Sequence, residues 1–143
     1  MSLLNQIQDD VKDAMKAGER DRVHALRLIV NELQKAAKEN GGDELDVLQR
    51  ERKRRLEAAE AYREGGRDDR AEAEEREAQI IGSYMPEQIS DEELNAIVGD
   101  AVAESGATSP KEMGKVMALV MPQVKGRADG KRVSASVKEH LVP

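Results

Sequence analysis

Apolar residues near the start of the chain recur with helical spacing. Between residues 3 and 15 they fall at positions i, i+3, i+4 and i+7, which predicts an amphipathic helix. Ser2 stands where an N-cap is expected, and Gly18 stands where the helix would stop. A second stripe with the same period consists of Leu26, Ile29, Val30, Leu33, Ala36 and Ala37. It predicts a second helix that Asp21 caps and residues 40–42 end.

Two longer helices are predicted in the middle of the chain. The first covers residues 44–64, and its apolar positions are Leu45, Leu48, Leu56, Ala59 and Tyr62. The second covers residues 68–84 and is mostly charged until Ala78, Ile80 and Ile81. We therefore expect the first half of this helix to be exposed and its second half to dock on other helices.

Pro86 marks the predicted domain boundary. Proline cannot continue a helix, and it biases Met85 away from helical angles. Ser90 followed by Glu93 forms a capping-box pattern, so a new helix is expected to start there. The sequence thus predicts an N-terminal helical domain over residues 1–86 and a smaller domain over residues 87–143.

Three short helices are predicted in the second domain. They cover residues 91–104, 110–121 and 130–141, and each has one apolar face. Ser109 with Glu112 supplies a capping box for the middle helix. The sequence shows no sustained alternation and no hairpin turn between β-branched runs, so no strand is predicted. The predicted fold class is all-α, with about four helices in the first domain and three in the second.

The composition agrees with helices and limits where the protein is expected to work. Aromatic residues make up 1% of the chain, so the core must come from Leu, Ile, Val, Met and Ala. The absence of Cys fits a reducing compartment, and no apolar run approaches the roughly 20 residues that span a bilayer. The N-terminus lacks the basic and apolar regions of a secretory signal. We therefore expect a cytoplasmic protein that does not bind a membrane.

No set of residues in the sequence forms a recognisable catalytic or metal site. Asp21 and His24 lie on one helical face, but a metal site in a bundle needs a matching pair from another helix. The only other histidine is His140. The serines have no elbow motif and no evident His–acid partner. The sequence predicts a chain that is not an enzyme and has no cofactor and no metal.

Residues 125–132, Lys-Gly-Arg-Ala-Asp-Gly-Lys-Arg, combine two glycines and four basic residues just before a predicted helix. The free N–H groups at a helix start can receive an anion. The segment is not a P-loop, because the spacing from Gly126 to Gly130 is one residue short and Arg132 occupies the Ser/Thr position. Two compatible interpretations stay open: a phosphate-contacting loop, and an ordinary turn in which Asp129 caps the last helix.

Positive charge is segregated toward the C-terminus. Residues 110–143 hold seven basic and three acidic residues, a balance of +4 in a chain whose net charge is −6. Any nucleic acid would therefore be bound by a local patch. A second cluster, Arg50, Arg52, Lys53, Arg54 and Arg55, lies in the third predicted helix. Its residues point around the helix, and Glu51 and Glu57 are near enough to pair with them, so a solvated face is expected there.

Gly114 lies inside a predicted helix, where glycine costs about 1 kcal/mol relative to alanine. Glycine at such a position is tolerated mostly where another group must come close. A crossing helix is the expected neighbour, and the backbone of a ligand is the alternative.

Three motifs stand out along the chain: Tyr84-Met85-Pro86-Glu87-Gln88, Met113-Gly114-Lys115-Val116-Met117 and Lys125-Gly126-Arg127-Ala128-Asp129-Gly130. They resemble motifs of the GatB/YqeY family. The likeness covers essentially the whole chain, including the basic third helix, which matches that of free-standing YqeY-like proteins. One departure is visible at residues 53–58, where many relatives have Lys-x-Arg-x-x-Ser and this chain ends the motif in alanine.

The resemblance implies a three-helix second domain similar to the tail of the GatB subunit of tRNA-dependent amidotransferases. In that enzyme the tail contacts tRNA, while the carbon–nitrogen ligase chemistry that uses glutamine occurs in domains that this chain lacks. The implied partners are tRNA and an amidotransferase or another protein. The implied phosphate-contacting residues are Lys115, Lys125, Arg127, Lys131 and Arg132. The residues implied to position them are Met113, Gly114, Met117, Gly126, Asp129 and Gly130.

Two functions of different classes follow. A non-catalytic tRNA-binding module, the leading hypothesis, predicts an affinity that falls steeply with salt. A protein–protein adaptor without nucleic-acid binding predicts salt-insensitive binding of a partner through apolar helix faces. An independent amidotransferase or hydrolase would need a nucleophile or metal site that the sequence does not offer.

Overall fold

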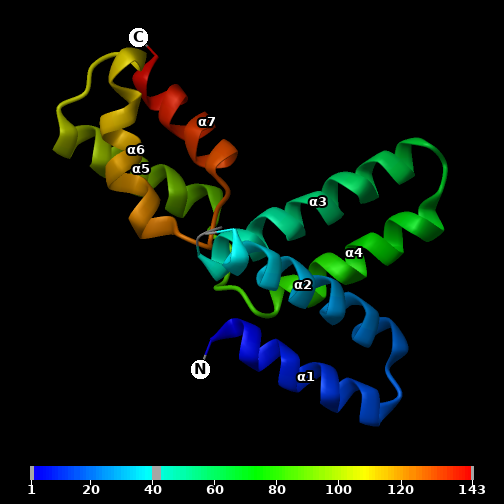
Figure 1. Cartoon of the computed structure of the whole chain (residues 1–143). Coiled ribbons are helices and arrows are strands. Elements are labelled where there is room, and N and C mark those ends of the chain that lie inside the picture. Colours follow the sequence, from blue (N-terminus) through cyan, green and yellow to red (C-terminus); the bar gives the residue numbers. More distant parts are fainter. Residues whose placement is uncertain (1, 40–42, 143) are drawn as a thin grey trace. The chain divides into compact units, whose positions relative to one another are not determined.

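The computed structural model describes residues 2–39 and 43–142. Within these residues the regular elements are seven α-helices and one 3₁₀ helix, without a strand, which confirms the predicted all-α class (Figure 1). Contacts divide the chain into two compact units, Met1–Pro86 (unit 1) and Glu87–Pro143 (unit 2). None of the described helices is both long and apolar enough to cross a bilayer.

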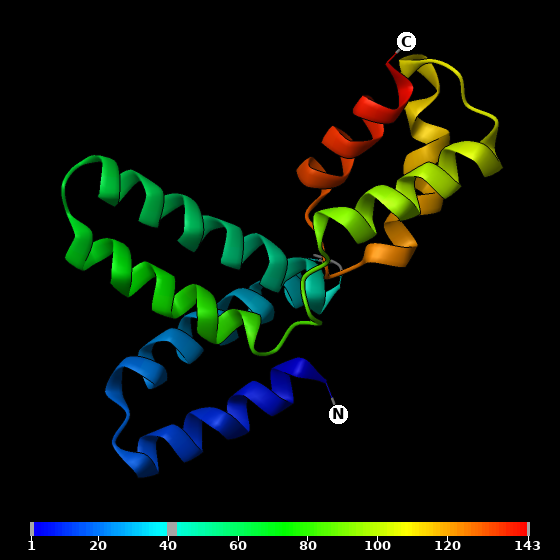
Figure 2. The same cartoon turned by 180° about the vertical axis from the view of Figure 1, so that it is seen from behind.

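Unit 1 consists of two antiparallel helix pairs (Figures 1 and 2). The helices are α1 (Leu3–Ala17), α2 (Arg20–Lys38), α3 (Glu44–Glu64) and α4 (Asp68–Gly82). Helix α1 packs on α2 and α3 packs on α4, while α2 also contacts α3 and α4. All four helices contribute to one core, whose fully buried members include Ile7, Leu26, Ile29, Leu48 and Ile81.

The ends of the first two helices test the capping predictions. Ser2 Oγ accepts a hydrogen bond from Asn5 N at 3.1 Å, and Gly18 ends α1 with φ 74°, so both predicted caps of α1 are confirmed. The predicted cap of α2 is wrong, because that helix begins at Arg20 and Asp21 lies inside its first turn. A carboxylate there still complements the positive end of the helix dipole. The predicted stop at residues 40–42 lies outside the described residues.

Buried alanines line the contact between α3 and α4. Ala59, Ala71 and Ala78 are almost fully buried, so the first half of α4, predicted to be exposed, packs against α3. Small side chains allow this approach where the charged sequence offers few large apolar ones. Leu56, predicted to face the core, is 39% exposed.

Glu51 is a buried carboxylate, only 3% exposed, on α3. Its oxygens lie 2.9 Å from Arg54 Nη1 and 3.8 Å from Arg55 Nη2, which confirms the predicted pairing of Glu51 with the basic cluster. Arg55 Nε also lies 3.0 Å from Glu77 Oε2 and 3.9 Å from Glu74 Oε2. Burial, reinforced by the charge of Glu77, raises the pKa of Glu74, and Arg55 opposes this shift. Part of the basic cluster is therefore neutralised within unit 1.

Tyr84 follows α4 and connects it to the first two helices. Its hydroxyl donates to Asp10 Oδ2 at 2.5 Å and accepts from Arg22 Nη2 at 3.4 Å. Burial, together with the hydrogen bond to Asp10, raises the pKa of Tyr84 above its ordinary value. The hydroxyl is thus held neutral between α1 and α2.

We expect Tyr84→Phe to lower the free energy of unfolding by about 1 kcal/mol, because both hydroxyl contacts are lost. A folded-state pKa above the unfolded one stabilises the fold at neutral pH, and this contribution is lost as pH rises past the ordinary tyrosine value of about 10. Urea titrations between pH 7 and 11 measure both effects. Tyr62→Phe is the matched control, since no hydroxyl partner of Tyr62 occurs among the described residues. Equal alkaline loss of stability in wild type and Tyr84→Phe would contradict this role.

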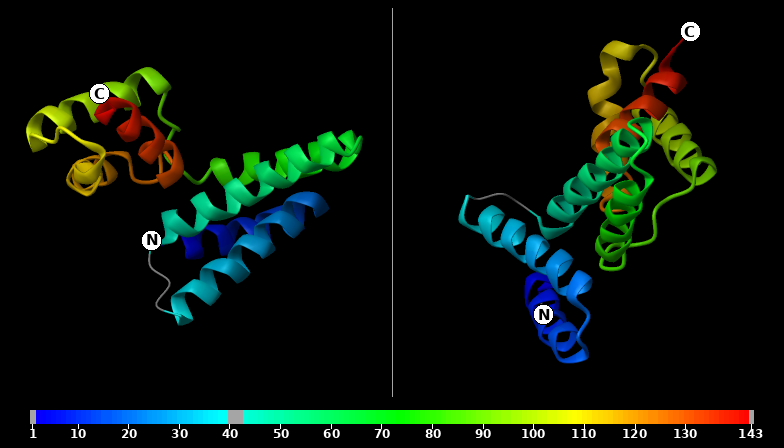
Figure 3. Two further views of the ribbon diagram at one scale, coloured as in Figure 1. Left: turned by 90° about the horizontal axis from the view of Figure 1, so that it is seen from above. Right: turned by 90° about the vertical axis from the view of Figure 1, so that its right-hand side faces the viewer.

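Unit 2 is a bundle of three helices, α5 (Asp91–Ser105), α6 (Met113–Val124) and α7 (Gly130–Leu141), each in contact with the other two (Figure 3). The short 3₁₀ helix η1 (Pro110–Glu112) precedes α6. The core of the bundle consists mainly of Leu94, Val98, Val116, Val120, Val124, Val133, Val137 and Leu141.

The predicted middle helix of unit 2 differs from the observed one at both ends. It starts as η1, and it continues through Pro122 to Val124, three residues beyond the predicted end. Proline removes one N–H donor from this last turn. Val120 and Val124 are fully buried on either side of Pro122, and their burial favours continuation of the helix.

Candidate functional site

The basic segment singled out in the sequence joins α6 to α7. Lys125 ends α6 and Gly126 adopts φ 76°, a left-handed conformation that favours glycine. The N–H groups of Arg127 and Ala128 both donate to Val124 O, at 2.8 and 3.3 Å. Ala128 is only 4% exposed and belongs to the core of unit 2. The segment is therefore a tight turn anchored on the bundle.

Asp129 and Gly130 start α7. Asp129 Oδ1 accepts a hydrogen bond from Arg132 N at 2.7 Å, which confirms the predicted cap. A Cβ added to Gly130 would meet no atom within 4 Å. The segment therefore forms the turn and the helix cap that one interpretation of the sequence predicted. The other interpretation, a phosphate-contacting loop, is compatible with this geometry and stays a prediction.

The two arginines of the segment bind acidic residues in the first turn of α5. Arg127 Nη1 and Nη2 lie 3.5 and 3.2 Å from the two oxygens of Glu93, and its Nε donates to Glu87 O at 3.1 Å. Arg132 Nη2 lies 2.7 Å from Asp91 Oδ1 and 2.6 Å from Ile89 O. Both guanidinium groups therefore have partners inside unit 2.

Backbone and amide bonds reinforce this contact between residues 87–93 and 126–132. Ile89 N donates to Arg127 O at 2.9 Å, and Gln88 Nε2 donates to Gly126 O at 2.9 Å. Ser90 Oγ accepts from Glu93 N at 3.1 Å, so half of the predicted capping box is confirmed. The Glu93 carboxylate binds Arg127 instead of closing the box. We call this set of contacts the loop clamp.

The lysines of the predicted site are more accessible than its arginines. Lys115, Lys125 and Lys131 are exposed. Lys115 Nζ lies 3.5 Å from Glu112 Oε1, and the lysine side chain is 65% exposed. The hydrogen bond from Thr108 N, assisted by one from Ser109 N, holds the pKa of Glu112 below its usual range. This carboxylate is therefore engaged by the turn before α6 as well as by Lys115.

Met113, Gly114 and Met117 lie in the first two turns of α6. Both methionines are partly buried against the core of unit 2. The expectation that a helix crosses closely over Gly114 is wrong, because a Cβ built there would have no neighbour within 4 Å. Gly114 instead leaves an open spot on the surface beside Lys115.

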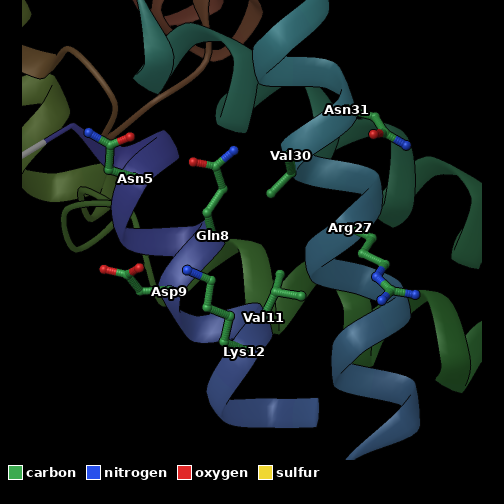
Figure 4. Close-up of a pocket in the computed structure, with 8 residues that line it drawn as sticks. All are labelled: Asn5, Gln8, Asp9, Val11, Lys12, Arg27, Val30 and Asn31. Atoms are coloured by element: carbon green, nitrogen blue, oxygen red, sulfur yellow. The ribbon is translucent and has the colours of Figure 1, made fainter.

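Unit 1 holds a groove between α1 and α2 (Figure 4). Gln8 and Val11 from α1 and Val30 from α2 point into the space between these helices. Its other lining residues are Asn5, Asp9, Lys12, Arg27 and Asn31. The groove mixes amides with charges of both signs, and none of the predicted phosphate-contacting residues lines it.

The histidines occupy separate places. His24 is exposed beside Asp21 in a depression between α2 and α4, and His140 Nδ1 lies 2.8 Å from Ser136 O on α7. Among the described residues no three His, Asp or Glu side chains are grouped closely enough to hold a metal ion. Within the part of the chain that the structure describes, neither histidine therefore belongs to a group of side chains that could hold a metal ion.

Sequence reasoning missed Asp91, Glu93 and Gln88 as partners of the basic segment. They lie 34 to 41 positions away along the chain from the residues they bind. Their only local signal, an acidic first turn after Ser90, is what any helix start favours. Nothing in that signal indicates a contact with residues 126–132.

Nearly the whole chain is similar to one family of known proteins. Residues 4–141 match the family described as Yqey-like protein. The chain is 27% identical over 145 residues to "Altered inheritance of mitochondria protein 41, mitochondrial" from Pyrenophora tritici-repentis, covering 96% of this chain and 80% of that protein. It is 32% identical over 89 residues to an uncharacterized protein from Schizosaccharomyces pombe, covering 59% of this chain and 72% of that protein. None of these descriptions states a reaction, and the match over residues 4–141 shows that the chain belongs to the YqeY-like family.

Proposed function

We propose that this protein is a non-catalytic tRNA-binding module and that unit 2 contacts the phosphate backbone. The observation that carries the proposal is the exposure of Lys115, Lys125 and Lys131 in the C-terminal part of the sequence, where residues 110–143 have a positive balance. Tethered ammonium groups at a solvated surface neutralise phosphates and release counterions, without needing a pocket. We further propose tRNA as the RNA and an amidotransferase as the class of enzyme that it accompanies, because this unit resembles the GatB tail, and the cytoplasm, expected from the sequence, as the compartment.

The distribution of charge favours phosphate contacts over binding by the whole surface. Residues 110–143 carry a balance of +4, while the rest of the chain is acidic. Acidic residues elsewhere repel RNA, and the other basic cluster, at residues 50–55, is partly neutralised by Glu51, Glu74 and Glu77. The three lysines come from the start of α6, the end of α6 and the start of α7. Lys115 and Lys125 are ten positions apart, which corresponds to roughly 15 Å along a helix.

The surface offers less support for the alternative, a protein–protein adaptor. Large exposed hydrophobic residues in the described parts of the chain are limited to Met15, Leu56 and Val142. They belong to α1, α3 and the residue after α7. Docking on a partner through apolar helix faces requires a contiguous apolar patch. Scattered single residues do not form one.

The test replaces Lys115, Lys125 and Lys131 together by Gln and measures binding of a tRNA transcript in 0.1 M salt. Each phosphate contact contributes a factor of roughly 5–8 through counterion release at this salt concentration, so we expect an affinity loss on the order of 100-fold. Arg127 and Arg132 stay unchanged, because the loop clamp depends on them.

A matched control changes Lys16, Lys35 and Lys38 of unit 1 to Gln. These lysines are also exposed, and the change in net charge is the same. The control should keep nearly the wild-type affinity. An equal loss in both triple variants would mean that only net charge matters, and binding unaffected by the unit 2 substitutions would refute the proposed surface.

A further inference from the structure

The loop clamp pairs two guanidinium groups with two carboxylates at the surface of unit 2. Arg127 binds Glu93 through both terminal nitrogens, and Arg132 binds Asp91 at 2.7 Å. The arginine side chains are 30% and 32% exposed, and the Glu93 and Asp91 side chains are 50% and 84% exposed. Both pairs are therefore open to solvent and to a competing anion.

The chemistry of these pairs is also that of phosphate recognition. A guanidinium group presents a planar fork of N–H donors that fits carboxylate and phosphate oxygens in the same way. Arg127 already holds the two oxygens of a carboxylate with that fork, in a segment that has four basic residues and one acidic residue. A backbone phosphate of RNA can accept the same donors.

We propose that Asp91 and Glu93 occupy in the free protein the positions that two RNA phosphates take in the complex, so that the first turn of α5 restrains RNA binding. This inference rests on the proposed function. It adds that two carboxylates of the protein itself compete with RNA phosphates for the arginines. Binding then exchanges two carboxylate partners for two phosphates on Arg127 and Arg132. The two arginines become RNA contacts only when that exchange occurs.

The remaining contacts of the clamp allow the exchange without unfolding the loop. Arg127 Nε still binds Glu87 O, and Arg132 Nη2 still binds Ile89 O. The bonds from Ile89 N to Arg127 O and from Gln88 Nε2 to Gly126 O do not involve either carboxylate. Exposed ion pairs contribute little to the free energy of folding, so exchanging them for phosphate contacts costs little free energy.

The experiment compares Asp91→Asn, Glu93→Gln and the double variant with wild type in binding a tRNA transcript. Glu92→Gln is the matched control, because Glu92 is exposed in the same turn and no partner of its carboxylate occurs among the described residues. Removing an exposed competing ion pair should raise the affinity roughly two- to fivefold per substitution relative to this control. Circular dichroism before each titration verifies that the variants are folded.

A second measurement needs no variant. We expect saturation of wild-type protein with tRNA to shift the NMR signals of the Nε–Hε groups of Arg127 and Arg132, since both change partners. Unshifted signals at saturation, or a double variant that binds like Glu92→Gln, would refute the proposed restraint. Either result would leave the proposal of tRNA binding standing. Absence of binding by both wild type and the double variant would instead remove the proposed function itself.

Discussion

Leu26→Ala is expected to lower the free energy of unfolding of unit 1 by about 2–5 kcal/mol. Leu26 has no exposed surface and lies in α2, the helix that contacts each of the other three helices of unit 1. Removing its side chain loses buried apolar contact and leaves a cavity that neighbours on several helices cannot all move to fill. Urea denaturation followed by circular dichroism measures the change.

Leu56→Ala provides the matched comparison for this prediction. The substitution removes the same atoms from a leucine that is 39% exposed on α3. We expect it to cost less, because 39% of the Leu56 surface already contacts water and its truncation opens to solvent instead of leaving an enclosed cavity. Equal losses from the two substitutions would mean that α2 is not the centre of the unit 1 core.

Gly126→Ala is expected to destabilise unit 2 by about 1–2 kcal/mol, since a side chain disfavours the left-handed conformation at φ 76°. Gly126 is buried and its carbonyl accepts the Gln88 amide, so the turn has little freedom to move away from this angle. Thermal unfolding measures the loss, and tRNA binding by the same variant reports whether the turn orients the neighbouring lysines.

Gly130→Ala serves as the control for the turn. A Cβ at this position meets no atom within 4 Å, and the residue opens α7. Alanine favours helix over glycine, so we expect this variant to be as stable as wild type or more stable. A similar loss at both glycines would show that the strain at Gly126 is not what fixes the turn.

Much of the fold follows from local patterns. Each of the seven α-helices among the described residues was predicted from the sequence, mostly from apolar positions that recur every 3.6 residues within a short segment. The caps at Ser2, Gly18 and Asp129 were also predicted, since each satisfies backbone groups within a few residues. These features depend on no distant part of the chain.

The errors in the fold arose where tertiary packing outweighed a local signal. Pro122 lies inside α6, because Val120 and Val124 beside it are buried in the core. Ala71 is buried although its neighbours are charged, because α3 packs against it. Leu56 is partly exposed despite its apolar character. Each outcome depends on a helix that the local sequence does not identify.

The candidate site was predicted in composition but not in geometry. The sequence identified the basic segment and its glycines, and the family motif covers the same residues. It did not separate the exposed lysines from Arg127 and Arg132, whose acidic partners lie far away in the chain. It also assigned a close neighbour to Gly114, whose surroundings are open. Charge density could be read from the sequence, whereas pairing required the three-dimensional arrangement.

The most direct test of the account is the affinity of the wild-type protein for a tRNA transcript across a salt series. Three lysine–phosphate contacts predict that log K falls linearly with log salt with a slope of roughly −2 to −3. Absence of binding even at low salt, or binding that does not change with salt, would contradict a phosphate-contacting module and make a protein–protein adaptor the better account.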